Sequence, residues 1–223
     1  MRVLVVTAVP AERDAVTRAC PAGFDVLAGG VGPAAAAATT ATALALPRAL
    51  KEQGGPPTPY DLVVSAGIGG GFLPLAPVGS LVVASRIVAA DLGADTPDGY
   101  LDVEALGFGR SVHLPPQELG RAVADATGAA YGPVLTVSTV TGTAARAAEL
   151  AARHPGAAAE AMEGFGVAEA AAQQGVPALE IRAVSNAVGP RDRSAWRIGD
   201  ALGALTDAFG KLPPVLESWN GHD

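Results

Sequence analysis

Four short segments of this 223-residue sequence carry residue types that could perform chemistry at one site. They span residues 8–12, 65–71, 161–164 and 181–186, and each follows or ends a run of apolar residues typical of a buried strand. They supply two carboxylates (Glu12 and Glu163), a guanidinium (Arg182) and an amide (Asn186). One carboxylate can take a proton from water, and a second can stabilise positive charge on a substrate.

Arg182 is the hardest of these residues to explain without a site. It lies within an apolar run, and a buried guanidinium needs anionic partners, for which Glu12 and Glu163 are candidates. Taken singly, the others have structural explanations. Glu12 could favour a helix dipole, Met162 could fill the core, and Asn186 could cap a helix or form a turn. The hypothesis of a site therefore depends on the whole set.

Alternating strand and helix patterns indicate the elements that must position these residues. Strand-like runs are expected at 2–7, 61–66, 80–90, 134–140, 157–162 and 178–185. Helices are expected at 10–20, 33–50, 117–127, 143–153, 163–174 and 195–209, with a loop at 54–59. This alternation predicts a single α/β domain over residues 1–223, with a mixed, mostly parallel sheet in a three-layer α/β/α arrangement. Ligands of such sheets bind at the carboxyl ends of the strands.

Composition excludes several classes of protein. Apolar residues form 49% of the chain, which is enough for one large aliphatic core, and the net charge of −7 disfavours binding to nucleic acid. No run approaches the roughly 20 apolar residues of a membrane span, so no membrane partner is expected. The N-terminus leads directly into strand-like sequence without a signal-peptide pattern, and Cys20 is the single cysteine. We therefore expect a cytoplasmic protein.

Common nucleotide, metal and nucleophile motifs are absent. The glycine run at 67–71 is followed by Pro74 and Pro77 rather than by a helix, so it is not a dinucleotide fingerprint. It also lacks the Gly-Lys-Ser/Thr of a phosphate-binding loop. The three histidines are scattered, which predicts no metal site, and no Gly-x-Ser-x-Gly elbow is present.

The order of the four segments resembles a known family. A glutamate soon after the first strand precedes a glycine run, then Met162-Glu163, then Arg182-Ala183-Val184-Ser185-Asn186. This order is similar to that of the 5′-methylthioadenosine/S-adenosylhomocysteine nucleosidases and, more closely, the futalosine hydrolases of menaquinone biosynthesis. The resemblance covers residue 1 to about residue 219. It implies cleavage of an N-glycosidic bond by water, with no metal and no cofactor.

The resemblance assigns a role to each residue. Glu12 matches the carboxylate that activates water, and Arg182 matches a strand arginine near that water. Met162 and Glu163 match the pair beneath the ribose, while Gly67, Ile68 and Gly69 match backbone that approaches the sugar. Asn186 matches the position that contacts the purine. Further base contacts are expected from Thr139, Thr141, Gly142 or Phe165, and Trp196 is expected beside the 5′ substituent.

Asn186 bears on the choice of base. The adenine-cleaving nucleosidases carry Asp at this position, whereas an amide can donate to a 6-keto oxygen and accept from a protonated N7. Asn186 therefore favours hypoxanthine, as in futalosine. Ile68 also departs from the serine of the methylthioadenosine enzymes, and Gly142 replaces the base-stacking Phe of that family.

Three alternatives remain open at this point. One is a methylthioadenosine/S-adenosylhomocysteine nucleosidase, and another is a non-catalytic nucleoside sensor. The third is a purine nucleoside phosphorylase, although Ser65 stands where those enzymes hold phosphate with arginine. Arg191, Arg193 and Arg197 are unranked candidates for binding a substrate carboxylate. The resemblance also implies a homo-oligomer, at least a dimer, acting on a small purine nucleoside.

Overall fold

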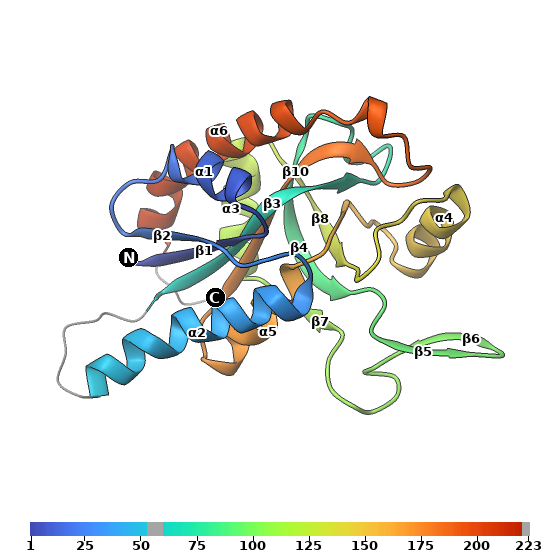
Figure 1. Cartoon of the computed structure of the whole chain (residues 1–223), viewed down its shortest axis with the longest axis horizontal. Helices are drawn as coiled ribbons and strands as arrows, with labels where there is room; N and C mark the ends of the chain where they lie inside the picture. Colours follow the sequence, from blue (N-terminus) through green and yellow to red (C-terminus); the bar gives the residue numbers. More distant parts are fainter. Residues whose placement is uncertain (53–59, 220–223) are drawn as a thin grey trace.

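The centre of the protein is an eight-stranded mixed sheet, seen in a computed structural model that describes residues 1–52 and 60–219 (Figure 1). The expected loop at 54–59 lies outside the described residues. The sheet consists of β1 (Val3–Thr7), β2 (Phe24–Ala28), β3 (Leu62–Gly71), β4 (Leu81–Ala89), β7 (Val112–His113), β8 (Ala130–Thr136), β9 (Ala159–Ala161) and β10 (Ala178–Ala187). A separate hairpin, β5 (Gly93–Thr96) and β6 (Gly99–Asp102), projects from the body (Figure 1).

Most strand pairings are parallel, as the sequence predicts. β1 pairs in parallel with β2 and β3, β10 with β3, β4 with β8, and β8 with β9. The pairings of β10 with β4, β3 with β9 and β4 with β7 are antiparallel. Because β3 pairs with both β10 and β9, the strands β3, β10, β4, β8 and β9 close on themselves. Closure was not predicted, because pairing between strands far apart in the chain leaves no local signal.

Helices cover both faces of the sheet and confirm the three-layer arrangement (Figure 1). On one face α1 (Pro10–Thr17), α3 (Gln117–Thr127) and α6 (Ile198–Ser218) contribute to a core that includes Leu119, Ile181 and Phe209. On the other face α2 (Pro33–Glu52) and α5 (Gly164–Gln173) pack with Leu4 and Val63. Helix α4 (Ala144–Arg153) lies between β8 and β9 in the sequence. In Figure 1 it lies at one end of the body. None of the helices in the described ranges has the length and apolar character needed to cross a membrane.

The Ala-rich helix α2 buries one stripe, as its sequence predicts. Ala36, Thr40 and Leu44 are buried and recur every four residues, which places them on one helical face. The backbone of α2 also approaches α5 closely. A side-chain carbon at Gly166 would collide with the carbonyl of Pro33, so glycine is required where the two helices meet.

Several boundaries differ from the expected ones. The glycine run forms the last residues of β3 rather than a loop, and β8 begins and ends four residues earlier than expected. The short strands β2, β5, β6 and β7 were not predicted, because they are brief and, apart from β7, half-exposed. Helix α6 runs through Pro213 and Pro214 to Ser218, where Leu212 and Leu216 are buried and hold the last turns against the core.

Candidate active site

One cavity of about 340 Å³ lies where β1, β3 and β10 end. These strands are parallel neighbours, so their carboxyl ends meet at one edge of the sheet. Segments far apart in sequence therefore surround a common space. Of the residues expected at the site, the cavity wall contains Glu12, Ile68, Gly69, Thr141, Met162, Glu163, Asn186 and Trp196.

Glu12 is fixed by backbone amides at the start of α1. Its Oε2 accepts hydrogen bonds from the amides of Ala8 (2.9 Å) and Val9 (3.1 Å), and its Oε1 accepts one from Ile68 (2.9 Å). The first two bonds belong to the capping of α1, and the third ties the helix to the glycine-rich end of β3. Glu12 is buried yet lines the cavity, so its carboxylate is held in one place and still faces a ligand.

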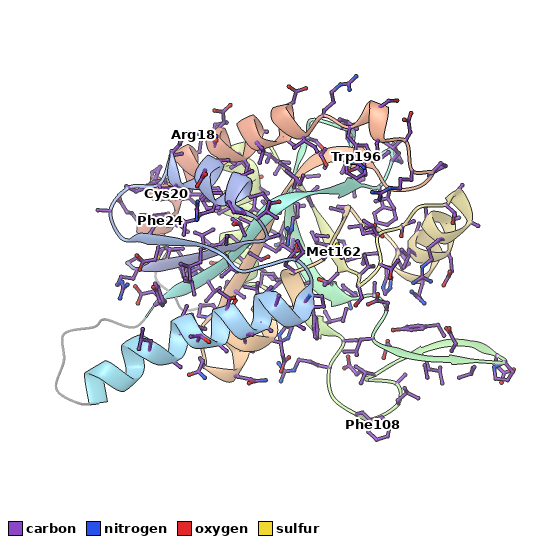
Figure 2. All side chains as sticks on the ribbon, in the orientation of Figure 1. Arg18, Cys20, Phe24, Phe108, Met162 and Trp196 are labelled. Atoms are coloured by element: carbon purple, nitrogen blue, oxygen red, sulfur yellow. The ribbon has the colours of Figure 1, made fainter. Side chains whose placement is uncertain are left out.

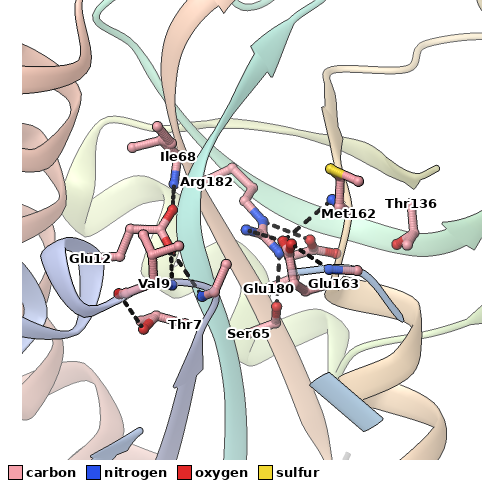
Figure 3. Close-up of polar contacts among 12 residues, drawn as sticks. Thr7, Val9, Glu12, Ser65, Ile68, Thr136, Met162, Glu163, Glu180 and Arg182 are labelled. Carbon is pink, nitrogen blue, oxygen red and sulfur yellow. Dashed lines mark hydrogen bonds and ion pairs between the residues drawn. The ribbon is translucent and has the colours of Figure 1, made fainter. Parts of the chain in front are cut away.

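Arg182 lies at the centre of a polar cluster on β10. Its Nε is 2.9 Å from Glu180 Oε1, its Nη2 donates to Ser65 Oγ at 3.0 Å, and its Nη1 is 3.2 Å from Glu163 Oε2. Figure 3 shows the guanidinium between Glu12 on one side and Glu163 with Glu180 on the other. Burial alone would lower the pKa of Arg182, but Glu180, Glu163 and Glu12 outweigh burial and raise it.

Two partners in this cluster were not expected from the sequence. Glu180 is fully buried two residues before Arg182, and burial raises its pKa although the guanidinium opposes that effect. Ser65 lies on β3, the neighbouring strand. Spacing of two on a strand places Glu180 and Arg182 on the same face, which is a signal that the sequence contained. The expected partner Glu163 does contact Arg182, whereas Glu12 acts on it only through its charge.

Gly67 explains how Glu12 and Arg182 come so close. A carbon atom added at Gly67 would lie 2.7 Å from Arg182 Nη1 and 2.7 Å from Glu12 Oε1. Both charged groups therefore lie over the bare backbone of β3. Arg182 Nη1 makes no hydrogen bond within the described chain. Its contact there is the 3.2 Å ion pair with Glu163, and Glu12 acts on it through charge alone.

Glu163 and Met162 follow β9 and precede α5. The carboxylate of Glu163 accepts from the amides of Gly32 (3.2 Å) and Met162 (3.3 Å) as well as facing Arg182. Glu163 is buried, and both residues line the cavity. The Met-Glu pair thus forms one wall, opposite the amino-terminal segment that carries Glu12.

Asn186 lies near the end of β10, just after an irregularity. Strand pairing shifts between Val184 and Asn186, which places Asn186 opposite Gly70 of β3. Its Oδ1 accepts from Ser185 Oγ at 2.9 Å, and its Nδ2 donates to the Ala187 carbonyl at 3.0 Å. The amide is therefore oriented and partly accessible in the cavity wall.

Glu160 is a cavity residue that our sequence analysis missed. It lies on β9, only 2% exposed, and accepts from both the amide (2.8 Å) and the hydroxyl (2.5 Å) of Thr141. Burial raises its pKa, while the two bonds from Thr141 oppose that effect. In sequence it is one acidic residue next to a more recognisable Met-Glu pair, so nothing distinguished it.

Other expected contacts lie outside the cavity wall. Thr139 and Gly142 are exposed on either side of Val140 and Thr141, and it is the latter two that line the cavity. At this point of the chain, Val140 rather than Gly142 therefore lines the cavity. Phe165 packs in the core, with its ring 5.0 Å from that of His113. Gly67 and Arg182 lie beneath the wall rather than in it.

Trp196 and Arg191 line the outer part of the cavity. Trp196 follows the short helix η1 (Arg193–Ala195), and Figure 2 shows it beside the segment that leads into α6. The Arg191 guanidinium lies 5.1 Å from the centre of the Trp196 ring. Arg193 lies 5.8 Å from the same ring but outside the wall, and Arg197 bonds backbone carbonyls. Arg191 is the one basic residue that lines the cavity in the described chain.

The charges in the wall limit what the cavity can hold. Among the described residues, Glu12, Glu160 and Glu163 face it, and Arg191 is the one cation that does. Neither Arg13 nor Arg86, the nearest arginines in sequence to the first two segments, lines it. Within residues 1–52 and 60–219, no three His, Cys, Asp or Glu side chains are placed to hold a metal ion together.

Comparison with known proteins places these features in a family. The family model described as the phosphorylase superfamily matches residues 25–212. The chain is 66% identical to a futalosine hydrolase of Streptomyces coelicolor, with all of both chains covered. It is 45% identical to a futalosine hydrolase of Acidothermus cellulolyticus, over 94% of this chain and 89% of that one.

The fold is also found among solved structures. A 5′-methylthioadenosine/S-adenosylhomocysteine nucleosidase of Neisseria meningitidis, solved with methylthio-immucillin-A, superposes with a TM-score of 0.72 at 20% identity, covering 98% of this chain and 99% of that one. This likeness shows the nucleoside phosphorylase-like architecture. Together with the full-length relatives, it shows that the chain belongs to the phosphorylase superfamily and, within it, to the futalosine hydrolase family of N-glycosidic bond hydrolases.

Proposed function

We propose that this enzyme hydrolyses the N-glycosidic bond of futalosine in the cavity described above and releases hypoxanthine, as a step of the futalosine route to menaquinone. The observation that carries the proposal is the cavity wall itself. It presents Glu12 and Glu163 from opposite sides of a buried guanidinium, with Asn186 in the same space. Water is consumed: its oxygen forms the new bond to ribose C1′ as the bond from C1′ to the purine breaks. One water proton goes to Glu12, and the purine, which leaves with the bonding electron pair, gains a proton from solvent to become hypoxanthine.

Glu12 is the general base in this proposal. Three backbone amides hold its carboxylate, yet a carboxylate has about four lone-pair positions, so it can still accept a proton from water. Arg182 lies beneath the cavity wall and acts on Glu12 through its positive charge. Glu12 therefore orients the attacking water by accepting its hydrogen bond and then takes its proton.

Glu163 stabilises the sugar as positive charge develops. Bond cleavage leaves a ribosyl group with cationic character, and a buried carboxylate lowers its energy more than an exposed one would. Glu163 is buried and fixed by two amides, so it needs little reorganisation during the reaction. Met162 packs under the ribose beside it.

Asn186 contacts the departing base. Its amide can donate to the 6-keto oxygen while its carbonyl accepts from a protonated N7. These groups bond to Ser185 and Ala187, which orients the amide, and the base would replace one or both partners on binding.

Water is favoured over phosphate as the nucleophile by the charge of the wall. Three carboxylates face the cavity and would repel a phosphate dianion. Ser65, which is uncharged, stands where the phosphorylases have an arginine. Ser65 is instead buried and accepts a hydrogen bond from Arg182. A neutral nucleophile meets no such repulsion.

The 5′ substituent of the substrate is assigned to the outer cavity. Trp196 offers an aromatic face, and Arg191 lies over it with a positive charge. An aromatic carboxylate, such as the carboxyphenyl group of futalosine, would stack on the ring and pair with the guanidinium. This ranks Arg191 ahead of Arg193 and Arg197.

We also propose a homo-oligomer, at least a dimer. Support comes from exposed apolar side chains around the projecting hairpin, where Leu92, Leu101 and Phe108 are 46%, 43% and 80% exposed. Figure 2 shows Phe108 at the end of a loop away from the body. Light scattering at micromolar concentration should give at least twice the chain mass of 22.1 kDa. A monomer mass would contradict the proposal.

The function is tested by following free base chromatographically in phosphate-free buffer. Futalosine, inosine and methylthioadenosine are incubated separately with the purified enzyme. Hypoxanthine released from futalosine alone is the expected result. Adenine released from methylthioadenosine would contradict the role given to Asn186, and release that begins only when phosphate is added would identify a phosphorylase.

A further inference from the structure

Glu160 is a buried carboxylate in the cavity that the reaction outlined above does not use. Glu160 is separate from the cluster around Arg182, because its hydrogen-bond partners are the amide and the hydroxyl of Thr141. Each carboxylate oxygen accepts one of these bonds, so about two lone-pair positions remain. A buried carboxylate with unused acceptor capacity at a ligand cavity can accept a further hydrogen bond from a donor on the ligand.

Strand pairing places Glu160 and Asn186 on either side of one glycine. Gly70 of β3 is opposite Asn186 of β10 and also opposite Glu160 of β9. Neighbouring strands are about 4.8 Å apart, so the backbones of Asn186 and Glu160 are separated by about 10 Å. A carbon atom added at Gly70 would lie 3.3 Å from Asn186 Nδ2. The same carbon would lie 2.9 Å from Val188 Cγ2, so the bare backbone at Gly70 makes room for Val188 and for the Asn186 amide.

A flat purine fits between two such polar groups. Hypoxanthine carries a 6-keto oxygen flanked by N7 on one side and by an N1–H on the other. If Asn186 contacts N7 and the keto oxygen, the group on the far side of that oxygen is the N1–H donor. A carboxylate is a strong acceptor for such a donor.

We infer that Glu160 accepts a hydrogen bond from N1–H of the base and is thereby a specificity-determining residue for 6-oxopurines. Adenine has no hydrogen on N1 and would present a lone pair to the carboxylate, which leaves two acceptors facing each other. Thr141 orients the carboxylate and keeps both of its oxygens in use. Asn186 and Glu160 thus recognise adjacent edges of one base. The inference rests on the proposed function, because it presumes that the base occupies this end of the cavity.

The test compares two substrates that differ in the substituent at C6 and, with it, in the hydrogen on N1. The value of kcat/KM is measured for futalosine and for its 6-amino counterpart with the wild-type enzyme and with Glu160→Gln. Glutamine keeps the size of glutamate but removes the charge, and its NH2 can donate to N1 of adenine. Hydrogen bonds to charged groups correspond to rate losses of roughly 10- to 150-fold. We expect kcat/KM for futalosine to fall by that factor and kcat/KM for the amino compound to change much less. The ratio of the two kcat/KM values should therefore fall at least 10-fold.

Controls separate this role from a structural one. Glu149→Gln removes one negative charge from the exposed surface of α4 and should leave the ratio of the two substrates unchanged. A binding measurement needs no variant: the wild-type enzyme should bind hypoxanthine at least 10-fold more tightly than adenine or 1-methylhypoxanthine, which both lack the N1–H. This second measurement decides the matter if Glu160→Gln fails to fold.

The outcomes distinguish the inference from the proposed function. An unchanged substrate ratio in a folded Glu160→Gln enzyme, or equal binding of hypoxanthine and 1-methylhypoxanthine, would overturn the role of Glu160 alone. Failure of the wild-type enzyme to release base from futalosine would instead overturn the proposed function.

Discussion

Arg182 shows how one buried cation can organise a site. It lies 1% exposed, with Glu180 and Glu163 within ion-pair distance and the charge of Glu12 acting on it from across Gly67. A guanidinium without these carboxylates would not remain buried, and the carboxylates would repel one another without the guanidinium. The positions of the proposed base and of the ribose carboxylate therefore depend on the same residue.

Loss of Arg182 alone should lower the free energy of unfolding more than loss of Arg182 together with the charge of one of its partners. Arg182→Met leaves Glu180 buried and unpaired, and breaking a buried pair in this way costs about 3–5 kcal/mol of unfolding free energy. The double variant Arg182→Met/Glu180→Gln removes the stranded charge and should be more stable than the single variant. Urea unfolding at one fixed protein concentration measures both. A double variant that is no more stable than Arg182→Met would contradict this account.

The same variant should have an altered pH dependence. Burial already raises the pKa of Glu180, and Arg182 opposes that effect, so loss of Arg182 should raise this pKa further. A carboxyl whose pKa is higher in the folded than in the unfolded state contributes stability below its unfolded pKa and loses it as pH rises through its folded pKa. Arg182→Met should therefore lose less stability relative to the wild type at pH 5 than at pH 8.

At the residue scale, the chemical types of the residues predicted which of them belong to the site better than they predicted which of them contact one another. Glu12, Glu163 and Asn186 could be placed at strand ends from local sequence, and the structure brings them into one cavity. Glu160 could not be chosen among the other acidic residues, since its burial follows from the pairing of β9 within the sheet. Glu180 could have been chosen from its spacing of two from Arg182 on one strand. Phe165 was misplaced because an aromatic side chain after a site glutamate suits a core as well as a ligand.

At the element scale, the end of β3 is the part that positions the residues of the site. Its glycines continue the strand instead of leaving it, so Arg182 and Glu12 can lie over Gly67, and Asn186 can lie beside Gly70. Glycine weakens strands in general, which is why the sequence pattern suggested a loop. Here β10 and β9 pair with both sides of this segment and keep it extended.

Long, strongly patterned elements were predicted well. The bounds of α3 match the expected ones, and α2 extends two residues beyond residue 50. The miss at β8 has a physical cause: residues 130–133 include a glycine and a proline, which normally discourage strands, yet they lie between β4 and Ala158. Tertiary pairing outweighs local preference there.

At the scale of the whole molecule, the reaction site follows from the topology. Parallel strands β1, β3 and β10 deliver Glu12, Ile68 and Asn186 to the same edge, while the closure of the sheet through β9 brings Glu160, Met162 and Glu163 to it. Helices on both faces keep these strand ends fixed. The site is thus assembled from residues more than 170 positions apart in the chain, from Glu12 to Asn186.

The central claim, that futalosine is hydrolysed in this cavity with Glu12 as base, is tested most directly by Glu12→Gln. The variant retains the size of the side chain and loses the proton acceptor, so kcat should fall by at least about 100-fold while futalosine binding by calorimetry stays near the wild-type value. Asp14→Asn, an exposed change on the same helix, serves as the control and should turn over normally. Wild-type turnover by Glu12→Gln would contradict the account.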